Sequence, residues 1–217
     1  MTKITPDLLI EAYKVGAFPM ANNHDDPKIE FFNPDPRGII PLETFHIPRS
    51  LRKLIKKDIF KVTYNAAFSS ILEGCSQVSR NRPTTWINHE IKTVYNQLFD
   101  MGYCHSIEIW CEKNIVGGLY GVSIGGAFFG ESMFSLKPNA SKIALVHLVA
   151  SLKQEGFILL DSQFTNKHLV QFGAIDISRE NYRKRLSFAI NQEARFPARS
   201  PELNYVLEPE HFRTQTS

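Results

Sequence analysis

The chain has 217 residues, of which 43% are hydrophobic and 22% charged, and its net charge is +3. This composition is typical of a globular protein with one large domain, or one domain and a small appendage. No apolar run reaches the roughly 18 residues of a membrane span, and the amino terminus lacks the features of a signal peptide, so we expect a cytoplasmic protein with no membrane partner.

Residues 5–16 have apolar side chains at helical spacing, with Thr5 as N-cap and Gly16 as C-cap. Five prolines between residues 17 and 41 allow little regular structure, although a short strand is expected at IEFFN (29–33). We therefore divide the chain into a small N-terminal domain, residues 1–45, and a larger domain, residues 46–217.

The larger domain begins with RSLRKLIKK (49–57), which predicts an amphipathic basic helix. The basic side chains that lie largely on its polar face are Arg49, Arg52, Lys53 and Lys56. One interpretation is that they form a solvated face over a core. The other is that they contact phosphates, because their charges share one sign and lie close together.

The following segments alternate between helical and β periodicity, which predicts an α+β domain. In chain order the pattern predicts two helices within 65–79 and 88–102, β-strands over 105–135 with a hairpin turn at 112–114, a helix over 140–154, a strand over 157–163, a short helix at 166–173, a basic segment at 178–186 and an extended proline-rich tail from residue 194.

Two polar side chains interrupt the apolar strand FILLDSQ. Asp161 and Gln163 are two residues apart and share a face of the strand, so the carboxylate can accept from the amide NH2 and orient it. The amide is too weakly basic to keep a proton, which must end on Asp161, water or a substrate. Alternatively, Asp161 caps the helix that begins near Asn166.

Glu131 follows the double-glycine strand GGAFFGE. A carboxylate beside aromatic side chains suits recognition of a cationic group, although a lone glutamate is also common at a surface or a helix cap. Trp86 and the pair Phe31-Phe32 are candidates for stacking on a nucleobase, or for simple packing beside prolines.

Several other kinds of site find no support. Cys75, Cys104 and Cys111 form no C-x-x-C pair, and the seven histidines have no metal-ligand spacing. Ser135 and Ser162 lack the G-x-S-x-G elbow of hydrolases, and glycine-rich phosphate loops are absent. The chemistry is therefore expected to be non-covalent and to depend on positioning and hydrogen bonds.

Motifs along nearly the whole chain resemble those of the bacterial leucyl/phenylalanyl-tRNA–protein transferases. The stretches that carry the resemblance are YKVGAFPM (13–20), NPDPRG (33–38), FHIPRSLRK (45–53), TWI (85–87), CHSIEIW (104–110), VGGLYGV (116–122), FGESMFS (129–135), NASKIAL (139–145) and LLDSQFTNKHLVQFGAIDISR (159–179).

This resemblance implies transfer of Leu or Phe, and less readily Met, from aminoacyl-tRNA to the α-amino group of proteins that begin with Lys or Arg. The product is then marked for the N-end rule protease. It also implies a small N-terminal domain and a GNAT-like (acetyltransferase-like) domain with a mixed, mostly antiparallel sheet. We expect a monomer with no metal and no organic cofactor.

The resemblance also assigns site residues. Asp161 and Gln163 match the catalytic D-x-Q pair, in which the carboxylate polarises the amide, and Glu131 is expected to hold the acceptor or the charged adenosine end. Asn166 matches an orienting polar position, and the basic helix becomes the contact for the tRNA acceptor stem. The residues matching the donor side-chain pocket are Leu119, Phe128, Ile143, Leu145 and Leu148.

Trp86 and Phe32 match the positions that stack on the terminal adenosine. Phe31-Phe32 departs from a tryptophan pair of the family, so the indole donor is lost there. Two rival functions remain open from the residues: an acetyltransferase that uses acetyl-CoA, and a non-catalytic RNA-binding module.

Overall fold

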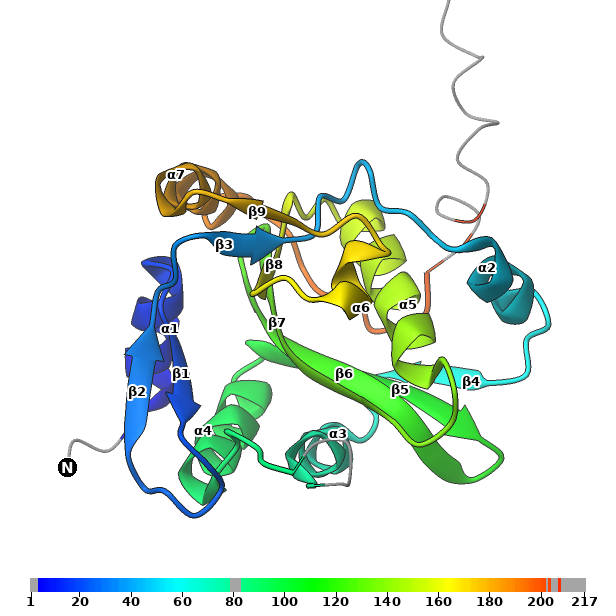
Figure 1. Cartoon of the computed structure of the whole chain (residues 1–217), viewed down its shortest axis with the longest axis horizontal. Coiled ribbons are helices and arrows are strands. Elements are labelled where there is room, and N and C mark those ends of the chain that lie inside the picture. Colours follow the sequence, from blue (N-terminus) through cyan, green and yellow to red (C-terminus); the bar gives the residue numbers. More distant parts are fainter. Residues whose placement is uncertain (1–3, 79–82, 202, 204–206, 208–217) are drawn as a thin grey trace, which may run out of the picture.

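The structure is a computed structural model that describes residues 4–78, 83–201, 203 and 207. Its centre is a seven-stranded sheet with strand order β4-β5-β6-β7-β8-β3-β9 (Figure 1). All neighbouring strands are antiparallel except β7 and β8, which are parallel. The prediction of an α+β fold with a mixed, mostly antiparallel sheet is confirmed. The strands are β3 (Arg37–Ile39), β4 (Lys61–Tyr64), β5 (Cys104–Cys111), β6 (Asn114–Ile124), β7 (Ala127–Ser135), β8 (Leu159–Gln163) and β9 (Ile175–Ile177).

The amino-terminal part contains α1 (Pro6–Lys14) and the hairpin of β1 (Phe18–Ala21) and β2 (Ile29–Phe32). As predicted, the Thr5 side chain caps α1, and Gly16 follows it with a φ of 84° that favours glycine. The next strand, β3, pairs in the seven-stranded sheet. With the expected boundary after residue 45, the N-terminal domain would therefore include β3, which is a strand of the large sheet.

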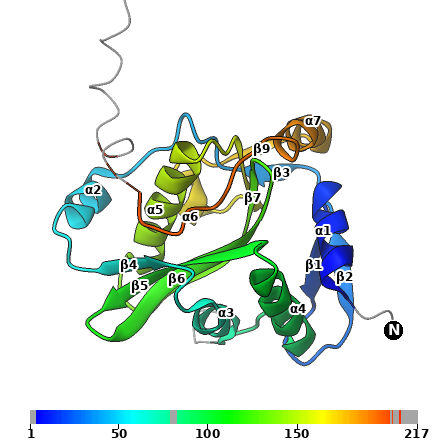
Figure 2. The ribbon, with the colours of Figure 1, turned by 180° about the vertical axis from the view of Figure 1, so that it is seen from behind.

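Helices cover both faces of the central sheet. The helix α5 (Ala140–Gln154) packs on β5, β6 and β7, whereas α3 (Phe68–Ser76) and α4 (His89–Asp100) lie against the opposite face (Figure 2). Twelve of the fifteen residues of α5 are buried, which explains why its sequence is apolar all round. Two apolar clusters, one on each side of the sheet, form the core.

The basic helix α2 (Arg49–Ile55) and the short α6 (Lys167–Val170) occur where the sequence predicts them, and the basic segment near residue 180 forms α7 (Arg179–Ala189). The expected hairpin turn joins β5 to β6. The expected C-terminal tail falls largely outside the described residues. Among the described helices, none combines the length and the apolar character needed to cross a bilayer.

Candidate active site

The parallel strands β7 and β8 diverge and open a pocket. They pair from Ala127↔Leu159 to Phe129↔Asp161, after which β7 continues along β6 and β8 continues along β3. The pocket has a volume of about 440 Å³ and lies between the separated strands, α5 and α6. Its wall includes both Glu131 and Asp161.

A β-bulge sets the position of Glu131. Pairing between β6 and β7 passes from Tyr120↔Ser132 directly to Gly121↔Gly130, so Glu131 has no partner on β6. Such bulges re-aim side chains and are frequent beside active sites. β7 and β8 approach each other closely at Gly130. A Cβ atom on this residue would lie only 3.3 Å from the Asp161 carbonyl oxygen.

The Glu131 carboxylate accepts hydrogen bonds from three neutral donors. Tyr13 Oη lies 2.7 Å from Oε1, Tyr95 Oη lies 3.0 Å from Oε2, and the Gln163 side-chain amide lies 3.0 Å from Oε1. The two phenol oxygens are themselves 2.5 Å apart. Burial raises the pKa of both phenols well above their ordinary value, which keeps them protonated as donors.

Burial raises the pKa of Glu131 from 4.5 to about 7. The hydrogen bonds from Tyr13, Tyr95 and Gln163 oppose this shift, whereas the nearby charge of Asp161 adds to it. A carboxyl group with a pKa near neutrality can exchange a proton or change its charge within the physiological range. Glu131 is therefore a titrating group at the pocket wall.

Asp161 is fully buried and forms an ion pair with Arg37, which is also fully buried. The guanidinium is bidentate: Nε lies 2.9 Å from Oδ1 and Nη2 lies 2.5 Å from Oδ2. Tyr182 donates to Oδ2 as well, at 2.7 Å. Burial lowers the pKa of Arg37, but the hydrogen bond and the charge of Asp161 outweigh it and leave that pKa raised.

The rings of Phe18 and Tyr182 cover this ion pair, with the Arg37 carbon Cζ 4.8 Å and 4.4 Å from their centroids. Arg37 also donates to the Gly16 carbonyl at 2.7 Å. The charge of Asp161 is thus balanced by a fixed cation and enclosed by aromatic groups.

The expected contact between the Asp161 carboxylate and the Gln163 amide is wrong. Asp161 Oδ1 accepts instead from the Gln163 backbone N–H, at 2.8 Å, while the Gln163 side-chain NH2 donates to Glu131. Gln163 has a φ of +65°, which turns its side chain away from the position that a regular strand would give it. The alternative in which Asp161 caps a helix is also wrong, because Asn166 caps α6 by accepting from Leu169.

β3 can approach the backbone turn after Gln163 closely because residue 38 is a glycine. A Cβ on Gly38 would lie 2.6 Å from the carbonyl carbon of Phe164. Between Gly38 and Ile39 the pairing with β8 skips Ser162, which leaves a second irregularity opposite the bulge of β7. Glu131 and Gln163 therefore lie at departures from regular strand pairing, whereas Asp161 itself pairs with both Ile39 and Phe129.

The structure brings some of the expected donor-pocket residues together. Leu119, Leu145 and Leu148 line the pocket, as does the orienting residue Asn166. Phe128 is completely buried in the core and does not line it, and Ile143 lines a separate cavity beside α2. Phe128 and Ile143 therefore do not belong to the wall of this pocket.

The two residues expected to stack on adenosine lie near opposite ends of β1. The Phe32 ring stacks on Phe18, with centroids 6.3 Å apart, whereas the Trp86 carbonyl accepts from the Ala21 N–H at 3.3 Å. Phe18 and Ala21 are the first and last residues of β1, which spans about 10 Å. Their backbones are thus well separated, and no aromatic contact joins the two rings within the described residues.

On α2, the side chains of Arg49, Lys53 and Lys56 are exposed, and Arg52 is half-buried. Leu51 anchors the opposite face in the core. The amphipathic arrangement predicted for this helix is confirmed, and its exposed face is basic.

Sequence reasoning missed four residues of the site: Arg37, Tyr13, Tyr95 and Tyr182. Arg37 lies in NPDPRG and Tyr13 in YKVGAFPM, both stretches that carry the family resemblance. Their place in these stretches was the signal that the sequence offered, whereas the burial of Arg37 on β3, which calls for a buried anion, is visible only in the structure. Within the described residues, no cluster of three or more His, Cys, Asp or Glu side chains could hold a metal ion.

Comparisons with known proteins agree with the sequence motifs. Residues 39–187 match the sequence model of the leucyl/phenylalanyl-tRNA protein transferase family, and residues 2–35 match that of its N-terminal domain. The leucyl/phenylalanyl-tRNA–protein transferase of Maricaulis maris (strain MCS10) is 53% identical over 195 residues, which cover 90% of each chain.

Among solved structures, that of L-PGS from Bacillus licheniformis is similar with a TM-score of 0.46 and 12% identity. The match covers 73% of this chain and 66%, just under two thirds, of that one. The family models and the bacterial relative, together spanning most of the sequence, agree with each other. The chain therefore belongs to the leucyl/phenylalanyl-tRNA protein transferase family of aminoacyltransferases.

Proposed function

We propose that the protein transfers Leu or Phe, and less readily Met, from aminoacyl-tRNA to the α-amino group of proteins that begin with Lys or Arg, and so marks them for N-end rule degradation. Family membership supports the reaction class. The observation that carries the proposal is the buried Gln163 amide, which donates to the half-buried carboxylate of Glu131 beside a largely apolar pocket.

The reaction is aminolysis of an ester. The nitrogen of the acceptor amine attacks the ester carbonyl, the new C–N bond forms, and the C–O bond to the terminal ribose breaks. The proton lost by the amine passes to the departing ribose oxygen. No covalent enzyme intermediate is needed, so the contribution of the protein is to position the two substrates.

In this reaction Gln163 orients the acceptor. Because its NH2 group donates to Glu131, the carbonyl oxygen of the same amide is left to accept a hydrogen bond from the attacking amine. Its backbone N–H is held by Asp161. We assign Asp161 to positioning and not to proton abstraction, since its negative charge is balanced by Arg37.

Glu131 attracts the positive charge of an acceptor that begins with Lys or Arg. Its hydrogen-bond partners are two phenols and an amide, so its own negative charge is not cancelled by a direct cationic partner in the described residues. A partly enclosed carboxylate of this kind favours a cation more strongly than one in water. The pKa of about 7 ties this attraction to pH.

The apolar wall receives the donor side chain. Leu119, Leu145 and Leu148 are proposed to contact Leu or Phe, and Asn166 at the mouth of the pocket orients the ester. Trp86 and Phe32 are proposed to contact the terminal adenosine, and the exposed residues of α2 the phosphates of the acceptor stem.

The overall architecture is proposed to be GNAT-like in the larger domain, because α5 connects two parallel strands whose divergence opens the pocket. We also propose that the protein acts as a monomer in the cytoplasm. The division into an N-terminal domain of residues 1–45 and a larger domain of residues 46–217 is also proposed, with β3 as the strand that the first contributes to the large sheet.

A transfer assay tests the function. Purified protein is mixed with tRNA charged with labelled Leu and a peptide that begins with Arg, or with the same peptide beginning with Ala. Label should enter the Arg peptide alone. Transfer to both peptides would contradict the proposed acceptor specificity, and transfer to neither would contradict the proposed reaction.

A further inference from the structure

The helix α7 has a basic outer face that the proposed catalytic roles do not use. We define this α7 basic face as Arg179, Arg183, Lys184 and Arg185, all of which are exposed. Tyr182, Leu186 and Ala189 bury the inner face of the same helix. The four basic side chains are therefore held on a packed helix and not on a loop.

The charge of the chain is concentrated in two places. Residues 179–185 contain four basic side chains and one acidic, and residues 49–57 contain five basic and none acidic. The chain has 25 basic and 22 acidic side chains in all, so the remainder holds 16 basic against 21 acidic. Since these two segments are net positive and the remainder of the chain is net negative, α2 and α7 are the segments where a polyanion is most strongly attracted.

Part of the α7 basic face is already paired. Lys184 forms an ion pair with Glu180 at 2.7 Å, and Arg179 lies 3.9 Å from Asp35. Arg183 and Arg185 form no ion pair with any residue that the structure describes. Because residues two apart on an α-helix point about 160° apart, these two guanidinium groups lie on opposite flanks of α7, one to each side of Lys184. Each is therefore suited to bind a separate external phosphate.

The α7 helix is also fixed to the candidate active site. Tyr182 donates to the buried carboxylate of Asp161, and Arg179 donates to the Asn33 carbonyl at 3.1 Å. Because an α-helix is about 10–12 Å across with its side chains, the outer face of α7 lies roughly one helix diameter from Asp161. This face therefore lies close to the pocket that is proposed to hold the aminoacylated end of the RNA.

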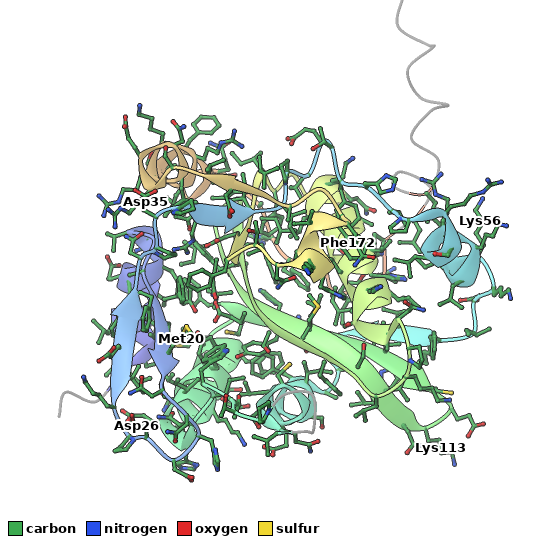
Figure 3. All side chains as sticks on the ribbon, viewed as in Figure 1. Met20, Asp26, Asp35, Lys56, Lys113 and Phe172 are labelled. Carbon is green, nitrogen blue, oxygen red and sulfur yellow. The ribbon has the colours of Figure 1, made fainter. Side chains whose placement is uncertain are left out.

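The two basic helices lie at opposite ends of one edge of the molecule in both ribbon views. In Figure 3, Asp35 lies beside α7 and Lys56 on α2, with β3, β9 and α6 between them. A small anion cannot bridge two such separated patches, whereas the backbone of a folded RNA extends over both. The arrangement thus fits a polyanion of the size of tRNA.

We propose that the α7 basic face binds backbone phosphates of the aminoacyl-tRNA substrate, as a second contact separate from α2. This inference rests on the proposed function for the identity of the RNA. The contact is to phosphates and not to base edges, so it contributes affinity and orientation for every charged tRNA that the enzyme accepts.

Binding measured as a function of salt tests the proposal. We compare the wild type with Arg183→Gln/Arg185→Gln, with Arg49→Gln/Lys53→Gln on α2, and with Lys113→Gln/Lys92→Gln as a control of equal charge change, in which Lys92 lies on α4. Lys113 lies in the β5–β6 turn, far from α7 in Figure 3. The probe is Leu-tRNA, titrated from low to high salt.

Loss of two phosphate contacts should flatten the slope of log K against log salt by about 1.4–1.8. When the binding constants of the variant and the wild type converge near 1 M salt, this change in slope corresponds to roughly 30-fold weaker binding of the variant at 0.1 M salt. The α2 pair should show a similar loss, and the combined variant should show the sum of the two slope changes, because distant sites act independently. The control pair should keep nearly the wild-type slope.

A donor without phosphates separates RNA binding from damage to the site. With leucine esterified to adenosine as the donor, the α7 variant should transfer at the wild-type rate, since Tyr182 and Asp161 are unchanged. A slope equal to that of the control pair would overturn the proposal. Equal impairment with the adenosine donor would also overturn it, because the effect would then arise from the position of Asp161.

The binding and transfer assays together distinguish an error in the role of α7 from an error in the proposed function. If the wild type binds Leu-tRNA but transfers nothing to the Arg peptide, the proposed reaction is wrong while the salt slopes still decide the role of α7. If the wild type does not bind Leu-tRNA, both proposals are refuted. Normal transfer with unchanged slopes for the α7 variant refutes this inference alone.

Discussion

Arg37 and Asp161 are 124 residues apart in the sequence and form a fully buried, bidentate ion pair beneath the candidate active site. The pair joins β3 to β8 and takes Tyr182 of α7 as a third member. Oδ1 of Asp161 also accepts a hydrogen bond from the backbone N–H of Gln163. One charge pair in the core thus connects the N-terminal region, the large sheet and the residue proposed to orient the acceptor.

Removing either partner should destabilise the protein. Arg37→Met leaves Asp161 as an unpaired buried charge, for which we expect a loss of about 3–5 kcal/mol in the free energy of unfolding. Arg37→Met/Asp161→Leu should lose less than Arg37→Met alone, because no uncompensated charge remains. Urea unfolding of both variants measures this. A double variant as unstable as the sum of both single ones would contradict the pairing.

Glu131 should make stability depend on pH. Its pKa is about 7 in the folded protein against an ordinary value of 4.5, so the folded state keeps its proton more strongly. The resulting stabilisation is present below pH 4.5 and is lost as the pH rises through 7, a change of roughly 3 kcal/mol. Relative to Glu131→Gln, wild-type stability should fall over this interval, as urea unfolding at several pH values would show. Parallel curves for the two proteins would contradict it.

Activity should depend on the same group in the opposite sense. If ionised Glu131 attracts the cationic acceptor, kcat/KM should rise as the pH increases through about 7. Tyr95→Phe removes a hydrogen bond that lowers the pKa of Glu131, so the rise should move to higher pH. Pre-steady-state transfer to one Arg peptide measures both profiles, and the peptide amine titrates equally in each. An unmoved profile in Tyr95→Phe would exclude Glu131 as its source.

The backbone and the side chain of Gln163 can be tested separately. Its φ of +65° costs a residue other than glycine about 1–2 kcal/mol, so Gln163→Gly should be more stable than Gln163→Ala by about that amount. Both variants lose the amide and should lose transfer activity about 100-fold or more. Thermal unfolding and transfer assays provide the two measurements. Substantial activity in either variant would remove Gln163 from its proposed role.

The pocket wall should set the preference between donors. Leu148→Phe reduces the pocket volume and should lower transfer of Phe relative to Leu by about 10-fold, within the 1–3 kcal/mol that such contacts supply. Phe128→Leu is the matched control, since Phe128 is buried outside the pocket and should change stability but not donor preference. Competition between the two charged tRNAs measures the ratio. A shift in the control alone would place Phe128 at the donor.

The sequence by itself determined the class of the fold, the extent of α5, the positions of α1 and α6, and the residues around which the site is built. Periodicity reports which faces of an element are buried, and capping residues such as Thr5 mark where a helix begins. The motifs also predicted that Asp161, Gln163 and Glu131 share one site, because all three match motifs of the same family although Glu131 lies far from the other two in the chain.

Only the tertiary structure decided how these residues are connected. The two irregularities of strand pairing, at Glu131 and at Ser162, have no signature in the local sequence, and they turn the Gln163 amide toward Glu131 and not toward Asp161. The partners Arg37 and Tyr182 lie far from Asp161 along the chain. A contact between distant residues depends on packing of the whole domain, and for this reason local periodicity could not predict it.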